Sequence, residues 1–245
     1  MRTRREMLGG LECRTVDWLA EGERPRMAVV LCHGFGAPGR DLVPLAAELV
    51  TLEPGLADAA RFVFPEGPMR LDDQGLPGGR AWWHIDINRL VAAVELGETR
   101  ILRSECPEGM AEARGTLSAL VEELRAATGL PASKIVLGGF SQGAMLATDL
   151  ALRLPDRPGG LCILSGSLVC EDEWRDLAPR RGPLPVVQSH GYEDPLLPFK
   201  AAEWLRDLLI DAGLDVDFVP FHGMHVIPPE TLSHAAALLR RLTAP

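Results

Sequence analysis

One serine of this chain lies where a nucleophile would be expected. Ser141 is part of a G-x-S-x-G pattern at residues 138–143, between an apolar run at 134–137 and a helix-like stretch at 144–151. A nucleophilic serine must project from a sharp turn between a strand and a helix, and glycines leave room for the two elements to pass closely. The N-terminus of the helix would then face a developing oxyanion. An incidental serine in a glycine-rich turn is the alternative, but the flanking strand and helix favour a nucleophile.

A serine nucleophile needs a general base, and six histidines compete for that role. In proteins with this turn, the serine is followed along the chain by an acid and then by the histidine. Four histidines fit this order poorly because they precede the serine, precede the acid or lie within the closing helix: His33, His84, His190 and His234. His225 follows the last predicted strand and a glycine, so we predict that it is the base. His222, in the same loop, remains the alternative.

The acid that orients the base should follow the preceding strand. Asp194 lies after the predicted strand that contains Val186, Val187 and Gln188, and directly before Pro195. A residue before proline is held in an extended or turn geometry, which suits a carboxylate directed inward. We predict that Asp194 is the acid, although spacing alone does not exclude the adjacent Glu193.

An oxyanion formed at the serine needs N–H donors, and backbone amides supply them in this arrangement. One donor is the N–H of the residue after the nucleophile, here Gln142. The second belongs to the loop after the early strand, residues 33–39, in which glycines allow the backbone to turn an N–H inward. Phe35 is the best candidate in that loop.

The composition and net charge of the chain indicate which classes of binding partner to expect. The chain has 245 residues, 47% of them hydrophobic, and a net charge of −9. This acidic balance argues against nucleic acid as the main partner and gives no attraction to anionic membranes. The sequence shows no secretory signal and no apolar run of transmembrane length, so we expect a cytoplasmic protein without integral membrane association. The five cysteines fit no zinc pattern, and we expect most of them to be small buried hydrophobic residues.

Strand-like and helix-like runs alternate along the chain, which predicts a mostly parallel sheet with helices on both faces. The predicted strands are residues 26–33, 61–64, 135–138, 160–164, 184–189 and 214–220. The predicted helices are residues 41–52, with Asp41 as the cap, 109–128, 142–154, 198–212 and 230–242. Because the sheet needs most of these strands, we interpret residues 1–245 as a single α/β domain.

The segment 65–107 interrupts this alternation. Connections of this length are uncommon unless they have a function, so we expect a loop on the substrate side of the protein. Residues 65–88 are predicted to form an irregular loop, and a helix is predicted within residues 89–105.

Five motifs taken together resemble the carboxylesterase/phospholipase family, which includes acyl-protein thioesterases and small bacterial carboxylesterases. They span nearly the whole chain in the family's order: residues 31–36, 138–144, 164–168, 190–195 and 223–225. The resemblance implies an α/β-hydrolase fold without a large cap domain. It implies a triad of Ser141, Asp194 and His225, with Phe35 and Gln142 as oxyanion donors.

One segment departs from the family pattern. The family tends to carry two aromatic residues followed by aspartate, whereas here Trp82 and Trp83 are followed by His84. An imidazole at that place would alter leaving-group recognition or make it depend on pH. We predict that these residues, together with apolar residues after the catalytic strands, bind the substrate: Trp82, Trp83, His84, Leu168, Leu196 and Met224. The alternative is that half of them only pack the loops.

These observations lead to a specific functional hypothesis. We expect a serine hydrolase that acts on short-to-medium acyl esters or thioesters through an acyl-enzyme, with a small-molecule substrate and no metal or organic cofactor. An acyltransferase or a peptidase with the same triad is one alternative, and a non-catalytic binding protein with a hydrolase fold is another. A homodimer is possible.

Overall fold

A mixed sheet of eight strands forms the centre of the computed structural model, which describes residues 1–86, 89, 92 and 103–243. The strand order is β1-β2-β4-β3-β7-β8-β9-β10. The strands of this sheet are β1 (Arg2–Leu8), β2 (Leu11–Asp17), β3 (Met27–Cys32), β4 (Ala60–Pro65), β7 (Ile135–Phe140), β8 (Gly160–Leu164), β9 (Pro185–Gly191) and β10 (Asp215–Phe221). The six strands from β4 to β10 in this order are parallel, as predicted, whereas β1 and β2 run antiparallel to their neighbours.

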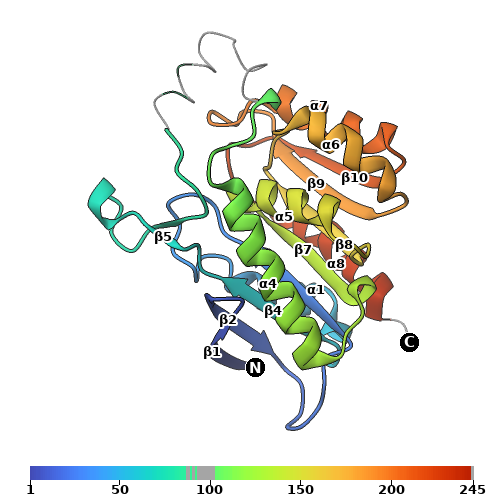
Figure 1. Cartoon of the computed structure of the whole chain (residues 1–245). Helices are drawn as coiled ribbons and strands as arrows, with labels where there is room; N and C mark the ends of the chain where they lie inside the picture. The colour runs from blue at the N-terminus through green and yellow to red at the C-terminus, as the bar shows by residue number, and fades with distance from the viewer. Residues whose placement is uncertain (87–88, 90–91, 93–102, 244–245) are drawn as a thin grey trace.

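Helices cover both faces of the sheet (Figure 1). The helices are α1 (Pro44–Leu52), α4 (Met110–Thr128), α5 (Gln142–Arg153), α6 (Glu171–Leu177), α7 (Phe199–Asp211) and α8 (Pro229–Thr243), with short 3-10 turns η1 (Pro54–Leu56), η2 (Asp72–Gln74), η3 (Ala132–Lys134) and η4 (Ala178–Arg180). Within the described residues, no helix is both long and apolar enough to cross a bilayer.

The central strand β3 shows how the two faces are separated. Ala28, Val30 and Cys32 belong to a core shared with α4, α5, α6 and α7, while the intervening Met27, Val29 and Leu31 belong to a core shared with α1 and α8. Successive side chains of a strand point to opposite faces, so a continuous apolar run is what a strand buried on both faces requires. The predicted α/β-hydrolase architecture is therefore present, with a mostly parallel sheet between two helical layers.

The parallel strands place their carboxyl ends at one edge of the sheet. The loops after β3, β7, β8, β9 and β10 therefore meet there, which is where open α/β sheets bind their ligands. Each segment from which we predicted a site residue emerges at this edge or, like residues 65–86, packs against it.

Several elements were not predicted. The hairpin of β1 and β2 turns at Gly9 and Gly10, which both have positive φ, and it extends the sheet on one side. Helix α6 was also missed. The proposed cap of the first helix was wrong: α1 begins at Pro44 after Val43, with no side-chain cap, and Asp41 lies in the preceding turn.

The first part of the substrate-side segment, residues 65–86, contains more regular secondary structure than predicted. Residues 65–86 contain a small antiparallel ribbon of β5 (Met69–Arg70) and β6 (Arg80–Ala81) in place of a fully irregular loop. Most of the helix predicted over 89–105 lies outside the described residues. That the chain forms a single domain stays a prediction.

The cysteines divide into two groups. Cys13, Cys32 and Cys162 are buried and free, as expected for small hydrophobic residues. Cys106 and Cys170 form a disulfide, which the spacing of the cysteines did not predict. The bond joins the segment before α4 to the residue that precedes α6.

Candidate active site

Ser141 has the strained backbone expected of a nucleophile between a strand and a helix. Its φ of 54° and ψ of −117° lie outside the usual regions, and it directly precedes α5. Its own N–H donates to Leu164 O at 2.9 Å, which ties the turn to β8. Any Cβ at Gly139 would lie 2.5 Å from Cys32 O, so only glycine allows β7, β3 and α5 to pack this closely.

His225 and Asp194 form a short charge-assisted pair at the carboxyl ends of β9 and β10. His225 Nδ1 lies 2.6 Å from Asp194 Oδ2. The other carboxylate oxygen, Oδ1, accepts hydrogen bonds from the Leu196 and Leu197 N–H groups, both at 2.9 Å. These three contacts fix the position of the carboxylate.

His190 is a second histidine in contact with the same carboxylate, and its position in the sequence did not predict this role. Its Nε2 lies 2.7 Å from Leu197 O and 3.3 Å from Asp194 Oδ2, and its side chain is fully buried. Burial alone would raise the pKa of Asp194, but hydrogen bonds from His190, His225 and the Leu197 N–H outweigh it and hold that pKa well below its usual range. The carboxylate is therefore ionised at neutral pH. His190 and Asp194 are four residues apart across a turn, and this spacing could have predicted that the two side chains meet.

His225 and Ser141 lie on the wall of one cavity. The imidazole packs against Phe140, the residue before the serine, with ring centroids 4.7 Å apart, and its side chain is 14% exposed. Among the described residues, no hydrogen bond joins His225 to Ser141. Such bonds commonly tighten only when substrate is bound.

The alternative base and acid lie away from this cavity. His222 Nδ1 is 3.3 Å from Glu193 Oε1, and the His222 side chain is 88% exposed. Neither residue lines the cavity that Ser141 and His225 share. The geometry therefore favours His225 and Asp194 over this pair.

The two predicted oxyanion donors belong to residues on the wall of the same cavity as Ser141. Gln142 is the first residue of α5, so its N–H has no partner within the helix. Phe35 lies in the turn after β3, where Gly36 adopts a φ of 81° and donates its N–H to Arg80 O at 2.9 Å. Both Phe35 and Gln142 line the cavity.

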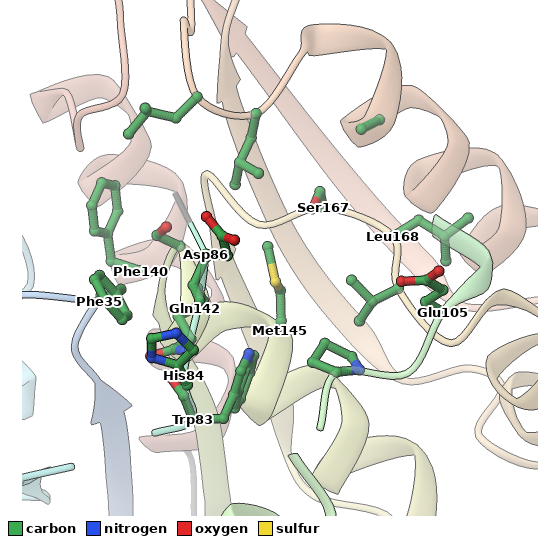
Figure 2. A pocket seen from close by; sticks show the side chains of 18 of the residues that line it. Phe35, Trp83, His84, Asp86, Glu105, Phe140, Gln142, Met145, Ser167 and Leu168 are labelled. Atoms are coloured by element: carbon green, nitrogen blue, oxygen red, sulfur yellow. Dashed lines mark hydrogen bonds between the residues drawn. The ribbon is translucent and has the colours of Figure 1, made fainter. Parts of the chain in front are cut away.

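The cavity has a volume of about 560 Å³, within the usual range for small-molecule sites. Figure 2 shows Trp83, Met145 and Leu168 along it, with Phe35 and His84 at one end and Glu105 at the other. The residues that form its mostly apolar wall include Phe35, Trp83, Ile85, Pro107, Phe140, Met145, Leu168, Val169, Leu196, Leu197, Pro198 and Ala201. The disulfide-bonded Cys106 also lies on this wall.

Polar and charged residues also line the cavity, among them His84, Arg89, Arg103 and Glu105. Arg89 pairs with Glu105 at 3.2 Å, and Arg103 pairs with Glu171 at 2.7 Å. His84 is exposed and lines the cavity.

Four of the six predicted substrate-binding residues line the cavity: Trp83, His84, Leu168 and Leu196. Trp82 does not, and this prediction is corrected: its side chain is buried, its ring packs on His33, and its indole N–H donates to His33 O. Met224 is also corrected, because its side chain points to solvent with 56% exposure.

Comparisons with known proteins agree with this architecture. The family model described as Phospholipase/Carboxylesterase matches residues 19–243. The chain is 30% identical to acyl-protein thioesterase 1 of Eremothecium gossypii, over 90% of each sequence. It is 32% identical to acyl-protein thioesterase 1 of Kluyveromyces lactis, over 84% of this chain and 87% of that protein.

Solved structures show the same similarity in three dimensions. The crystal structure of esterase PE8 superposes with a TM-score of 0.77 at 30% identity, covering 95% of this chain and 99% of PE8. The strained serine turn, the paired histidine and carboxylate, and the strand order thus occur in a chain that resembles known esterases along nearly its full length. The chain belongs to the phospholipase/carboxylesterase family, and it is a serine hydrolase with the α/β-hydrolase fold.

Proposed function

We propose that this enzyme hydrolyses carboxylic esters or thioesters of short-to-medium acyl chains through Ser141, His225 and Asp194. The observation that carries the proposal is the 2.6 Å contact between His225 and Asp194 at a cavity that Ser141 also lines. A serine, an imidazole and a buried carboxylate in this relationship support nucleophilic catalysis. The names of the relatives, thioesterase and esterase, support the same class of substrate.

The first half of the reaction acylates the serine. His225 Nε2 takes the proton of the Ser141 hydroxyl as Oγ bonds to the substrate carbonyl carbon. The Phe35 and Gln142 N–H groups stabilise the oxyanion of the tetrahedral intermediate. His225 then gives its proton to the departing alcohol or thiol as the carbon–oxygen or carbon–sulfur bond breaks.

The second half releases the acid. His225 removes a proton from water, and the resulting oxygen attacks the acyl-enzyme carbonyl. Collapse of the second tetrahedral intermediate returns the proton to Ser141 and frees the carboxylic acid. Asp194 stabilises the imidazolium that forms in each half, and its depressed pKa keeps it ionised for this role.

The apolar wall supports an acyl-binding role for the cavity. Trp83, Met145 and Leu168 offer hydrophobic surface to an alkyl chain, and each buried methylene contributes about 0.8 kcal/mol. His84, Arg89 and Glu105 line the same cavity and are exposed, which supports a solvated leaving group near them.

The test is a series of p-nitrophenyl esters from acetate to palmitate beside a matched thioester series, with Ser141→Ala as control. We expect serine-dependent turnover with an optimum of chain length. Turnover by the Ser141→Ala variant at the wild-type rate would refute the proposal. A cytoplasmic location and a homodimer stay predictions.

A further inference from the structure

The side chain of Gln142 makes two buried hydrogen bonds that have nothing to do with its backbone N–H. Its Oε1 accepts from the Trp82 N–H at 3.0 Å, and its Nε2 donates to Trp83 O at 2.9 Å. Gln142 is fully buried. The side-chain amide therefore bonds to one backbone N–H and one backbone carbonyl, much as a neighbouring strand would. These two bonds join residues 82–83 to the first turn of α5.

Trp82 continues this connection to the other side of the serine. Its indole Nε1–H donates to His33 O at 2.9 Å, and its ring lies against the His33 ring with centroids 5.3 Å apart. Two residues earlier, Arg80 makes two further backbone bonds, accepting from Gly36 N–H at 2.9 Å and donating to Ala37 O at 3.1 Å. The segment 80–83 thus bonds to the loop that carries Phe35 and to the helix start that carries Gln142.

His33 holds the start of the loop after β3 through two hydrogen bonds of its ring. Its Nδ1–H donates to Gly34 O at 2.8 Å, and its Nε2 accepts from the Gly67 N–H at 2.9 Å. Burial lowers the pKa of His33 below its ordinary value, so the ring is neutral at neutral pH and keeps an acceptor for Gly67. His33 therefore fixes the backbone just before Phe35.

From these contacts we infer that Trp82 and the Gln142 side chain are positioning residues for the oxyanion hole. The two N–H donors come from separate elements, the loop after β3 and the start of α5, and the segment 80–83 bridges them through five hydrogen bonds. The bridge sets the separation of the two donors. This inference rests on the proposed function, because it assumes that Phe35 and Gln142 bind the oxyanion.

A fixed separation of the two donors should favour catalysis. An oxyanion hole acts only when its donors are held in place before the charge develops. Displacement of one donor weakens binding of the tetrahedral intermediate but leaves binding of the planar ester largely unchanged. Loss of the bridge should therefore lower kcat far more than it changes KM.

Trp82→Phe tests the bridge because it removes the indole N–H and keeps an aromatic ring. We expect kcat to fall about 10- to 100-fold with KM within about twofold, because a full oxyanion donor is worth about 10²- to 10³-fold. An alkylboronic acid, which forms a tetrahedral adduct on the serine, should bind more weakly by a factor similar to the loss of kcat.

Trp174→Phe is the matched control. The indole of Trp174 is also fully buried and donates to a carboxylate, Asp149 Oδ1 at 2.8 Å, but it does not line the cavity. We expect this variant to lose stability while its kcat stays within about twofold of wild type, as expected for a residue outside the site. Equal losses of kcat in both tryptophan variants would overturn the inference, because the effect would then be general loosening.

Gln142→Met gives a second and independent test if Trp82→Phe fails to fold. The methionine side chain has a similar length but cannot donate to Trp83 O and is only a weak acceptor for the Trp82 N–H, while the backbone N–H of residue 142 remains. We expect the same pattern, a loss of kcat with little change in KM. Wild-type kcat in either folded variant overturns the inference, whereas activity in Ser141→Ala would instead refute the proposed function.

Discussion

His225 Nδ1 lies 2.6 Å from Asp194 Oδ2, although the two residues are 31 positions apart in the chain. The contact exists because β9 and β10 are parallel neighbours, so the loops that follow them emerge side by side. With one ring nitrogen held by the carboxylate, the other is left to face the cavity that Ser141 lines. The pair therefore fixes both the orientation and the tautomer of the imidazole.

Replacement of Asp194 by asparagine should remove most of the turnover. The amide cannot stabilise an imidazolium, and it favours the wrong tautomer of His225. We expect kcat for p-nitrophenyl acetate to fall by about 10⁴-fold. Glu193→Gln is the matched control, because the Glu193 side chain pairs with His222 and the Gly223 N–H and does not line the cavity, and its kcat should stay within about twofold. A comparable loss in both variants would contradict the assignment of the acid.

The same carboxylate should make stability depend on pH in a definite direction. The pKa of Asp194 is depressed in the folded protein, so its ionised form stabilises the fold at pH values above the unfolded carboxyl pKa of about 3.9. This contribution is lost progressively as the pH falls below that value toward the folded-state pKa. Urea unfolding at pH 7 and pH 3 should show Asp194→Asn less stable than wild type at pH 7, with a smaller difference at pH 3. A difference that does not change with pH would argue against the depressed pKa.

Trp83 should limit the length of acyl chain that the cavity accepts. Its indole lines the cavity, so Trp83→Ala enlarges the space and should shift the preferred p-nitrophenyl ester by several methylenes toward longer chains, each worth about 0.8 kcal/mol. Met224→Ala should leave the chain-length profile unchanged, because that side chain points to solvent. An unchanged profile in Trp83→Ala would remove Trp83 from the acyl-binding wall.

The free thiols should be unreactive in the native protein. Cys13, Cys32 and Cys162 are buried, and burial raises the pKa of the Cys13 and Cys162 thiols to about 12. Titration with a thiol-specific disulfide reagent should detect no fast-reacting group before reduction. After mild reduction, the exposed Cys106 should react. Fast reaction of a thiol in the unreduced protein would contradict either the disulfide or the burial of the three free cysteines.

Most of the fold was predictable from local pattern. The strand of residues 160–164 was predicted with the bounds that β8 has, because a fully buried parallel strand is a continuous apolar run. The hairpin of β1 and β2 was missed because Arg2–Leu8 is mostly polar and exposed, as an edge strand tends to be. The pair Gly9 and Gly10 was a hairpin signal that the sequence did contain.

The candidate site was predictable where chain order and motif carry the chemistry. The turn pattern and the order in which such residues occur predict Ser141, Asp194 and His225, and the structure pairs His225 with Asp194. The role of Trp82 was not predictable, because the hydrogen bond to Gln142 spans 60 residues and depends on how a long loop folds back. The disulfide of Cys106 and Cys170 likewise joins residues 64 apart whose proximity only the tertiary fold creates.

The proposed mechanism requires that Ser141 receive the acyl group of the substrate. Rapid mixing of the enzyme with p-nitrophenyl acetate, followed by acid quench and mass analysis of the peptide that contains residue 141, tests it directly. We expect a burst of p-nitrophenol, an acetyl group on that peptide, and the loss of both in Ser141→Ala. A burst of wild-type size in Ser141→Ala, or an acetyl group on another residue of the wild-type enzyme, would contradict it.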